Sequence, residues 1–166
     1  MLHEMTVTGL AIDPASNAPI LILSAKNEEF TVPIWIGLME AASIASVLQG
    51  IDFERPMTHD LFKNFIDRMN VKVSRIEICD LKNNTFFAKI YCHAPDDDEF
   101  ILDARPSDAI ALGLRLKADI FVEEAVVNEL KTTDGKYEAA DESDQGKKWE
   151  EYLKNLNPDD FGKYKV

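Results

Sequence analysis

Two short segments that contain an Arg-Pro pair carry the residues best suited to chemistry. They are residues 55–60 (RPMTHD) and 103–108 (DARPSD). Each predicts a helix start, because proline fits the first helical turn and a nearby acid complements the helix dipole. Each also places an arginine, a hydroxyl and a carboxylate at a helix N-terminus, where anions bind well. The repeated combination is harder to explain as two unrelated helix caps than a single segment would be.

A third acid, Glu40, occupies an equivalent position at the start of an earlier predicted helix. Three helix starts that converge on one pocket would bring several functional groups together. These residues are Glu40, Arg55, Thr58, His59, Asp60, Arg105, Ser107 and Asp108.

This set predicts metal-assisted chemistry on a phosphate. Carboxylate oxygens of Glu40, Asp103 and Asp108 would hold Mg²⁺ or Mn²⁺, which prefer oxygen ligands. Arg55 and Arg105 would grip the phosphate bidentately.

The remaining residues of the set complete the hypothesis. Thr58 and Ser107 would assist in binding the substrate. His59 would act as general acid or base, because an imidazole titrates near neutral pH. Asp60 is the remaining catalytic candidate, beside Glu40 and Asp108.

A structural interpretation of the same residues competes with the catalytic one. Arg55 or Arg105 could form a buried ion-pair network with Asp103 and Asp108 that fixes the fold. The chain has no Gly-rich phosphate loop, no nucleophile elbow and no paired-cysteine metal motif. The sequence alone leaves both interpretations open.

Composition limits the class of protein. The chain has 166 residues, 46% of them hydrophobic, and a formal net charge of -12. That acidity argues against holding nucleic acid by surface attraction, because phosphate binding usually needs a basic face. We expect no membrane span and no signal peptide, and therefore a cytoplasmic protein. The two cysteines, Cys79 and Cys92, are expected to be reduced.

The elements that position the candidate residues form an α+β pattern. Strands are predicted near residues 6–13, with a bulge at Gly9, and near 20–23 and 30–36. A helix follows over 37–50, with Gly50 as its left-handed C-terminal cap. A second helix is predicted to begin with Thr58 as its N-cap and to end at residue 70. Its predicted apolar face consists of Leu61, Phe62, Phe65, Ile66 and Met69. We expect a mixed, mainly antiparallel sheet.

The second half of the chain repeats this order. A hairpin over 71–93, turning at residues 83–84 and placing Cys79 opposite Ala88, leads to a strand, a helix over 106–116 and a short strand over 120–122. The two halves read as βββα units. An internal duplication and a chance alignment of Ala-rich helices both account for this likeness.

The C-terminal part differs in character from the rest. We expect a domain over 1–130, an acidic flexible linker over 131–148, and an amphipathic helix with a tail over 149–166. That helix is too short to be stable alone in water, so it is expected to dock on the domain or on a partner.

The chain resembles the bifunctional nuclease domain family of bacteria, archaea and plants. The matching segments are residues 32–37 (VPIWIG), 40–41 (EA), 55–61 (RPMTHDL) and 103–112 (DARPSDAIAL), in family order. The resemblance covers about residues 1–130 and implies an α+β domain with nuclease activity on DNA and RNA.

Three functions therefore compete at the sequence level. The first is a nuclease that binds nucleic acid as a transient substrate, assisted by Mg²⁺ or Mn²⁺. The second is a non-enzymatic module that binds a small anion or a protein through the same Arg/Asp cluster. The third is a purely structural role for the motifs. Self-association is expected from spare apolar strand surface and the Ala-rich helix.

Overall fold

The computed structural model describes residues 1–27, 30–96 and 98–132. In this part of the chain four helices accompany seven strands. Their order is β1 (Leu2–Ile12), β2 (Pro19–Ala25), β3 (Thr31–Trp35), α1 (Leu38–Leu48), α2 (Thr58–Arg68), β4 (Lys72–Lys82), β5 (Thr85–His93), β6 (Glu99–Ala104), α3 (Pro106–Leu116), β7 (Asp119–Glu123) and α4 (Glu124–Thr132).

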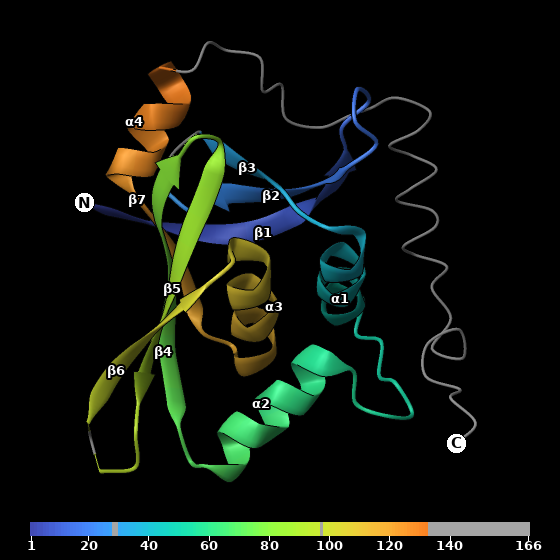
Figure 1. Ribbon diagram of the computed structural model, residues 1–166, viewed down its shortest axis with the longest axis vertical. Coiled ribbons are helices and arrows are strands. Elements are labelled where there is room, and N and C mark those ends of the chain that lie inside the picture. Colours follow the sequence, from blue (N-terminus) through green and yellow to red (C-terminus); the bar gives the residue numbers. More distant parts are fainter. Residues whose placement is uncertain (28–29, 97, 133–166) are drawn as a thin grey trace.

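The strands form one mixed sheet in the order β3-β2-β1-β7-β4-β5-β6. Neighbouring strands are antiparallel except for β4 and β7, which are parallel. Each half supplies three antiparallel strands and then a helix, and β7 joins the halves (Figure 1). The predicted α+β class, with a mainly antiparallel sheet, is confirmed.

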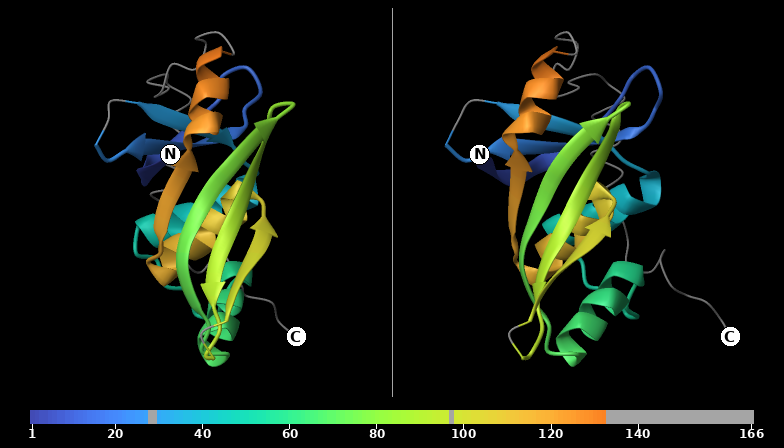
Figure 2. Two further views of the ribbon diagram at one scale, coloured as in Figure 1. Left: turned by 90° about the vertical axis from the view of Figure 1, so that its left-hand side faces the viewer. Right: turned by 60° about the vertical axis from the view of Figure 1, so that its left-hand side comes forward.

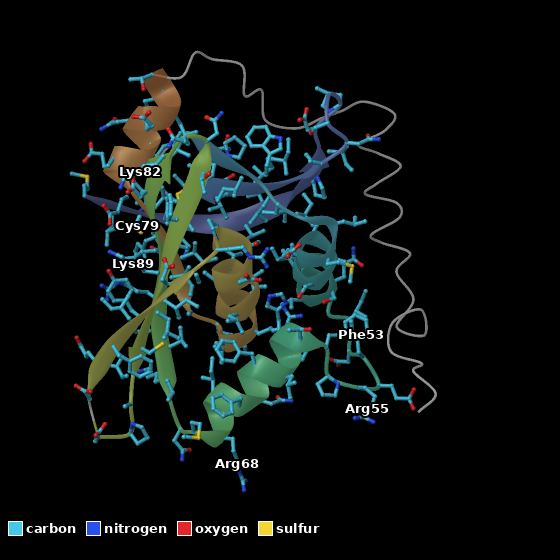
Figure 3. All side chains as sticks on the ribbon, in the orientation of Figure 1. Phe53, Arg55, Arg68, Cys79, Lys82 and Lys89 are labelled. Carbon is cyan, nitrogen blue, oxygen red and sulfur yellow. The ribbon has the colours of Figure 1, made fainter. Side chains whose placement is uncertain are left out.

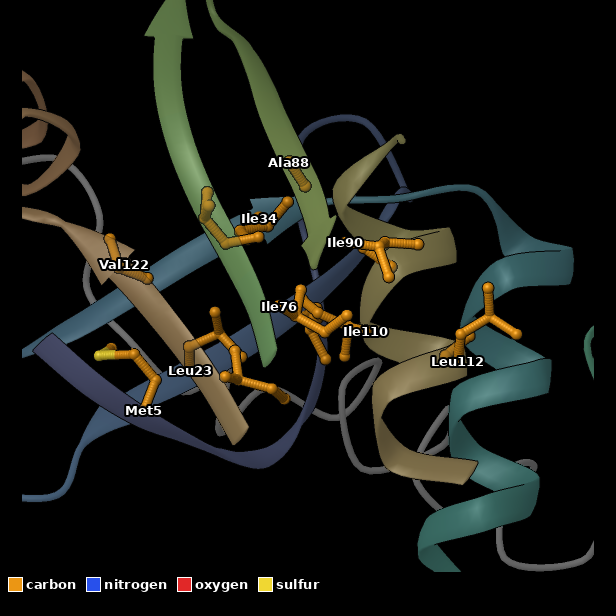
Figure 4. Close-up of a cluster of buried hydrophobic side chains, with 14 of the residues drawn as sticks. Met5, Leu23, Ile34, Ile76, Ala88, Ile90, Ile110, Leu112 and Val122 are labelled. Atoms are coloured by element: carbon orange, nitrogen blue, oxygen red, sulfur yellow. The ribbon is translucent and has the colours of Figure 1, made fainter. Parts of the chain in front are cut away.

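The core lies between the sheet and α3. Ile34 of β3, Ile76 of β4 and Ile110 of α3 are almost fully buried and lie in one cluster (Figure 4). The helix approaches the sheet closely at Gly113, where an added Cβ would lie 2.8 Å from Cγ1 of Ile76. Small residues on α3 therefore set the distance between that helix and β4.

Several local predictions are confirmed. The register between β1 and β2 shifts between Val7 and Gly9, as expected for a bulge at this glycine. Gly50, after α1, has a φ of 64°, the left-handed conformation that ends many helices. Asn83 and Asn84 have φ values of 49° and 59°, which suit a two-residue hairpin turn.

Two expectations are wrong by one residue. Ala88 lies opposite Ile78, not Cys79, because the β4 register shifts between Ile78 and Asp80. The N-cap of α2 is Met57 rather than Thr58, which is the first helical residue. Both cysteines are free, as expected.

The helix α2 uses its apolar residues differently from an ordinary core helix. Only Ile66 is buried, whereas Leu61, Phe62, Phe65 and Met69 are exposed. The helix lies at one end of the molecule, away from β1–β3 (Figure 2). The sequence predicted the apolar face of α2, but only Ile66 of that face packs against the rest of the domain.

The last element in the described ranges is a helix that the residue pattern had not predicted. Helix α4 runs over Glu124–Thr132 and buries Val126 and Val127. From residue 133 onward, the expected linker and C-terminal helix lie outside the described residues. In the described ranges, no helix is long and apolar enough to cross a membrane.

Candidate active site

Helix α3 brings the second Arg-Pro segment to the centre of the molecule, where it packs against both α1 and α2. Arg105 is the N-cap, with extended backbone angles (φ −66°, ψ 144°), and Pro106 begins the helix. Proline suits this position because its fixed φ is helical and its missing N–H would have no partner there. The side chain of Arg105 is thereby placed beside the first turn of α3.

Arg105 is held by two carboxylates. Its Nη2 lies 2.8 Å from Oε1 of Glu40 on α1, and its Nε donates to Oδ2 of Asp108 at 2.7 Å. Glu40 packs over Gly37, since a Cβ at residue 37 would collide with the Glu40 carboxylate. The Arg105 side chain remains 65% exposed, so it is oriented by the protein but accessible to a ligand.

His59 of α2 connects Asp108 to helix α1. Its Nε2 lies 2.9 Å from Oδ1 of Asp108, and its Nδ1 lies 2.8 Å from the hydroxyl of Ser43 on α1. The histidine side chain is 15% exposed. A continuous chain of contacts therefore runs from Ser43 through His59, Asp108 and Arg105 to Glu40, which we call the polar relay.

The charge of Asp108 is stabilised inside this relay. Burial alone would raise the pKa of its carboxyl group. Hydrogen bonds from Arg105 and His59, with their favourable charges, outweigh burial and lower the pKa. Asp108 is therefore an anion at neutral pH, and it can orient the imidazole and accept its N–H.

A second arginine, Arg115, joins the three helices. Its Nε donates to Oδ1 of Asp60 at 2.6 Å, and its Nη2 donates to the carbonyl oxygen of Ser43 at 3.3 Å. The other Asp60 oxygen accepts the backbone N–H of Met57 at 3.0 Å. The Arg115 side chain is only 5% exposed, so this group fixes the helices rather than facing a ligand.

Ser43 and Arg115 were missed by the sequence reasoning. Ser43 lies between the apolar positions Ala41 and Ile44 of α1, and Arg115 lies between two leucines near the end of α3. A polar residue that interrupts an apolar stripe is a usable signal, because a buried polar group needs a partner.

A pocket of about 570 Å³ adjoins the relay at Arg105. It is bounded by the end of β3, the β4–β5 turn, the start of α3 and one residue of α4, Leu130. Trp35, Phe86 and Ser107 are among its lining residues. The volume lies in the range typical of small-molecule sites. Arg105 is the residue that belongs to both the pocket and the relay.

The structure brings four of the predicted residues together, namely Glu40, His59, Arg105 and Asp108. The others lie outside the relay. Asp60 binds Arg115, and Ser107 lines the pocket. Thr58 and Asp103 are exposed on α2 and β6. Arg55 lies on the outer loop between α1 and α2, away from α3 (Figure 3).

The proposed metal ligands are therefore distributed unevenly. Glu40 and Asp108 both contact Arg105, whereas Asp103 lies opposite Lys89 on the neighbouring strand. Over the described ranges, no three or more His, Cys, Asp or Glu side chains are grouped to hold a metal ion. The relay would supply two carboxylates, those of Glu40 and Asp108, to such a metal site.

The fold and the site define an α+β domain with an ion-paired relay open to a pocket. The chain belongs to the bifunctional nuclease domain family, whose sequence profile matches residues 21–134. That range contains the whole relay.

Relatives of this chain fall into two groups. An uncharacterized protein of Mycobacterium tuberculosis (strain H37Rv) is 36% identical over 165 residues, 96% of this chain and 98% of the relative. Bifunctional nuclease 2 of Arabidopsis thaliana is 27% identical over 123 residues, 73% of this chain but 37% of the plant protein. The bifunctional nuclease of Oryza minuta is 24% identical over 112 residues, 66% of this chain and 34% of that protein.

Proposed function

We propose that this chain is a nuclease that hydrolyses phosphodiester bonds of DNA, RNA or both at the polar relay. The observation that carries the proposal is the position of Arg105, which borders the pocket and is tied to Asp108 and His59. A phosphate bound by this arginine would be connected through Asp108 to His59, a group able to move protons. The family relationship to plant proteins named bifunctional nucleases supports the same reaction.

The pocket would take one nucleotide unit of the substrate. Trp35, 37% exposed, and Phe86 offer aromatic surface on which a base can stack, a contact that tolerates any sequence. The exposed side of the Arg105 guanidinium would hold the phosphate. Binding through a few local contacts suits a chain of net charge -12, because such a chain does not attract a polyanion over its whole surface.

His59 would move the proton that hydrolysis requires. In this reaction a water oxygen bonds to phosphorus, the bond to the leaving sugar oxygen breaks, and a proton passes from the water to the leaving oxygen. Asp108 and Ser43 engage the two ring nitrogens of His59. In this proposal Asp108 orients the ring and links it to the phosphate site at Arg105, and Ser43 holds the other ring nitrogen.

A divalent ion is part of the proposal. With a neutral imidazole, the carboxylates of Glu40 and Asp108 outnumber the single cation Arg105, so the relay repels a phosphate. Mg²⁺ or Mn²⁺ on these two carboxylates would reverse the sign of the local charge, with water and phosphate oxygens as further ligands. The ion would thereby make the site attractive to its substrate.

The test is cleavage of end-labelled DNA and RNA oligonucleotides by the purified chain with Mg²⁺, Mn²⁺ or EDTA. We expect cleavage that depends on the metal and is lost in Asp108→Ala. Cleavage that is unchanged by EDTA, by Glu40→Ala and by Asp108→Ala would exclude the metal-assisted mechanism. Absence of cleavage under every condition would exclude the nuclease.

The same site supports a second function, a regulatory module that binds a small anion without cleaving it. Its specific support is the pocket volume of about 570 Å³, which suits a small molecule better than a polymer. A mononucleotide that binds, with loss of binding in Arg105→Met and no cleavage of any oligonucleotide, would favour this module. For either function we place the chain in the cytoplasm, where its free cysteines would stay reduced.

A further inference from the structure

The exposed apolar face of α2 is unusual for a helix packed on a domain. Leu61 is 61% exposed, Phe62 38%, Phe65 57% and Met69 51%. The rings of Phe62 and Phe65 are stacked, with centroids 6.4 Å apart. These four side chains form one continuous strip, because residues four apart lie on the same side of a helix. We call this surface the α2 strip.

We propose that the α2 strip is a dimer interface, in which the α2 helices of two copies of this chain pack antiparallel across a two-fold axis at Phe65. A two-fold interface must be complementary to itself. In an antiparallel pair centred on Phe65, a residue that lies n positions before 65 in one copy faces the residue that lies n positions after 65 in the other copy.

The residues of α2 satisfy this condition in pairs. Phe65 faces Phe65 of the second copy, and Leu61 faces Met69, so each apolar residue meets another. Phe62 faces Arg68, which is exposed and points away from the domain (Figure 3). A guanidinium over an aromatic ring is an attractive contact, and the two-fold axis would form it twice.

Charge opposes a second copy least at this surface. The chain carries a net charge of -12, so two copies repel each other over most of their surface. The α2 strip is free of carboxylates, since Asp60 and Asp67 lie about 140° and 200° around the helix from Phe65 at 100° per residue. Asp60 is bound to Arg115 and Asp67 to Lys63. Arg68 instead adds a positive charge at the edge of the strip.

Dimerisation would also restrict the movement of helix α2 and therefore of His59. Helix α2 carries His59 but buries only Ile66 against the domain. A second copy would cover the exposed side of the helix and hold it in place. The inference itself does not depend on the reaction, because it rests on the surface of α2 alone.

The first test is sedimentation equilibrium of the full chain from about 1 µM to about 1 mM, a range that detects weak dimers. We expect an apparent mass that rises toward twice the 18.7 kDa of the chain. Phe65→Asp should keep the mass at one chain. The matched control is Phe87→Asp, an aromatic residue with 40% exposure on β5, which should still dimerise. A wild-type chain that stays monomeric throughout would overturn the proposal, as would a dimer that Phe65→Asp leaves intact.

A second test probes the geometry. In a Cys79→Ser background, Phe65→Cys should cross-link to itself under mild oxidation, because both copies of residue 65 lie on the axis. Phe87→Cys should not. A dimer in which Phe65→Cys fails to cross-link would refute the antiparallel arrangement. Circular dichroism melting of each variant excludes unfolding as the cause.

Discussion

Two arginines of α3 should respond in opposite ways to the same substitution. Arg115 is 5% exposed and joins α1, α2 and α3, whereas Arg105 is 65% exposed and borders the pocket. We therefore compare Arg115→Met with Arg105→Met, since methionine keeps an unbranched chain of similar length. The first change should reduce stability, and the second should reduce function.

The expected loss for Arg115→Met follows from its contacts. Breaking a fully buried ion pair costs about 3–5 kcal/mol. Asp60 is 29% exposed and keeps its bond from Met57, so water can compensate it in part. We expect the free energy of unfolding to fall by about 3 kcal/mol, which lowers Tm by roughly 6–12 °C for a chain of this size.

Arg105→Met should behave differently because its ion pairs are largely solvated. Surface ion pairs contribute about 0–1 kcal/mol each, so the loss of both pairs of Arg105, at about 0.5 kcal/mol each, should lower Tm by roughly 2–4 °C. Loss of the phosphate-binding cation should reduce cleavage by about 100-fold or more. Lys89→Met, which removes an exposed cation from β5, is the control and should change neither property.

The assays are thermal unfolding by circular dichroism and initial cleavage rates of a labelled oligonucleotide at a temperature where every variant is folded. The reasoning would be refuted if Arg105→Met lowered Tm as far as Arg115→Met and reduced the rate only in proportion to unfolded protein. That outcome would make the relay a structural ion-pair network.

Three further predictions concern the relay. The folded protein lowers the pKa of Asp108, so the stability that its charge contributes is fully present above the unfolded pKa and is lost as pH falls through the folded pKa. Urea titrations should therefore show that wild type is more stable than Asp108→Asn at neutral pH and that this difference disappears below about pH 4. Gly37→Ala should displace the Glu40 carboxylate and reduce cleavage while Tm changes by less than about 4 °C, and unchanged cleavage would contradict that account. Ser43→Ala should reduce the cleavage rate by about 10-fold to 100-fold with little effect on substrate KM, whereas an unchanged rate would show that His59 acts without the hydroxyl.

The sequence predicted the elements well where local chemistry decides them. Pro106 marks the start of α3, Gly50 the end of α1, and two asparagines the β4–β5 turn. The β4 register was wrong because a bulge beside Cys79 depends on packing rather than on residue pattern. Helix α4 was missed although Val126, Val127 and Leu130 have helical spacing, because it is only nine residues long and follows β7 directly.

The candidate site was predictable in part for a similar reason. Helix starts are local features, so Glu40, His59 and Asp108 were found from their positions in the sequence. Ser43 and Arg115 lie inside helices, and their partners are set by how α1, α2 and α3 pack. Arg55 has the same local motif as Arg105, yet the loop between α1 and α2 carries it away from the relay.

The most direct test of the central claim is the single-turnover cleavage rate of Asp108→Asn compared with wild type, on the same single-stranded oligonucleotide with Mg²⁺ or Mn²⁺ present. Asparagine keeps the shape of the residue but cannot hold the charge that orients His59 and Arg105. We predict a rate at least about 100-fold lower with the fold intact. Equal rates for the two proteins would contradict the assignment of the relay as the active site.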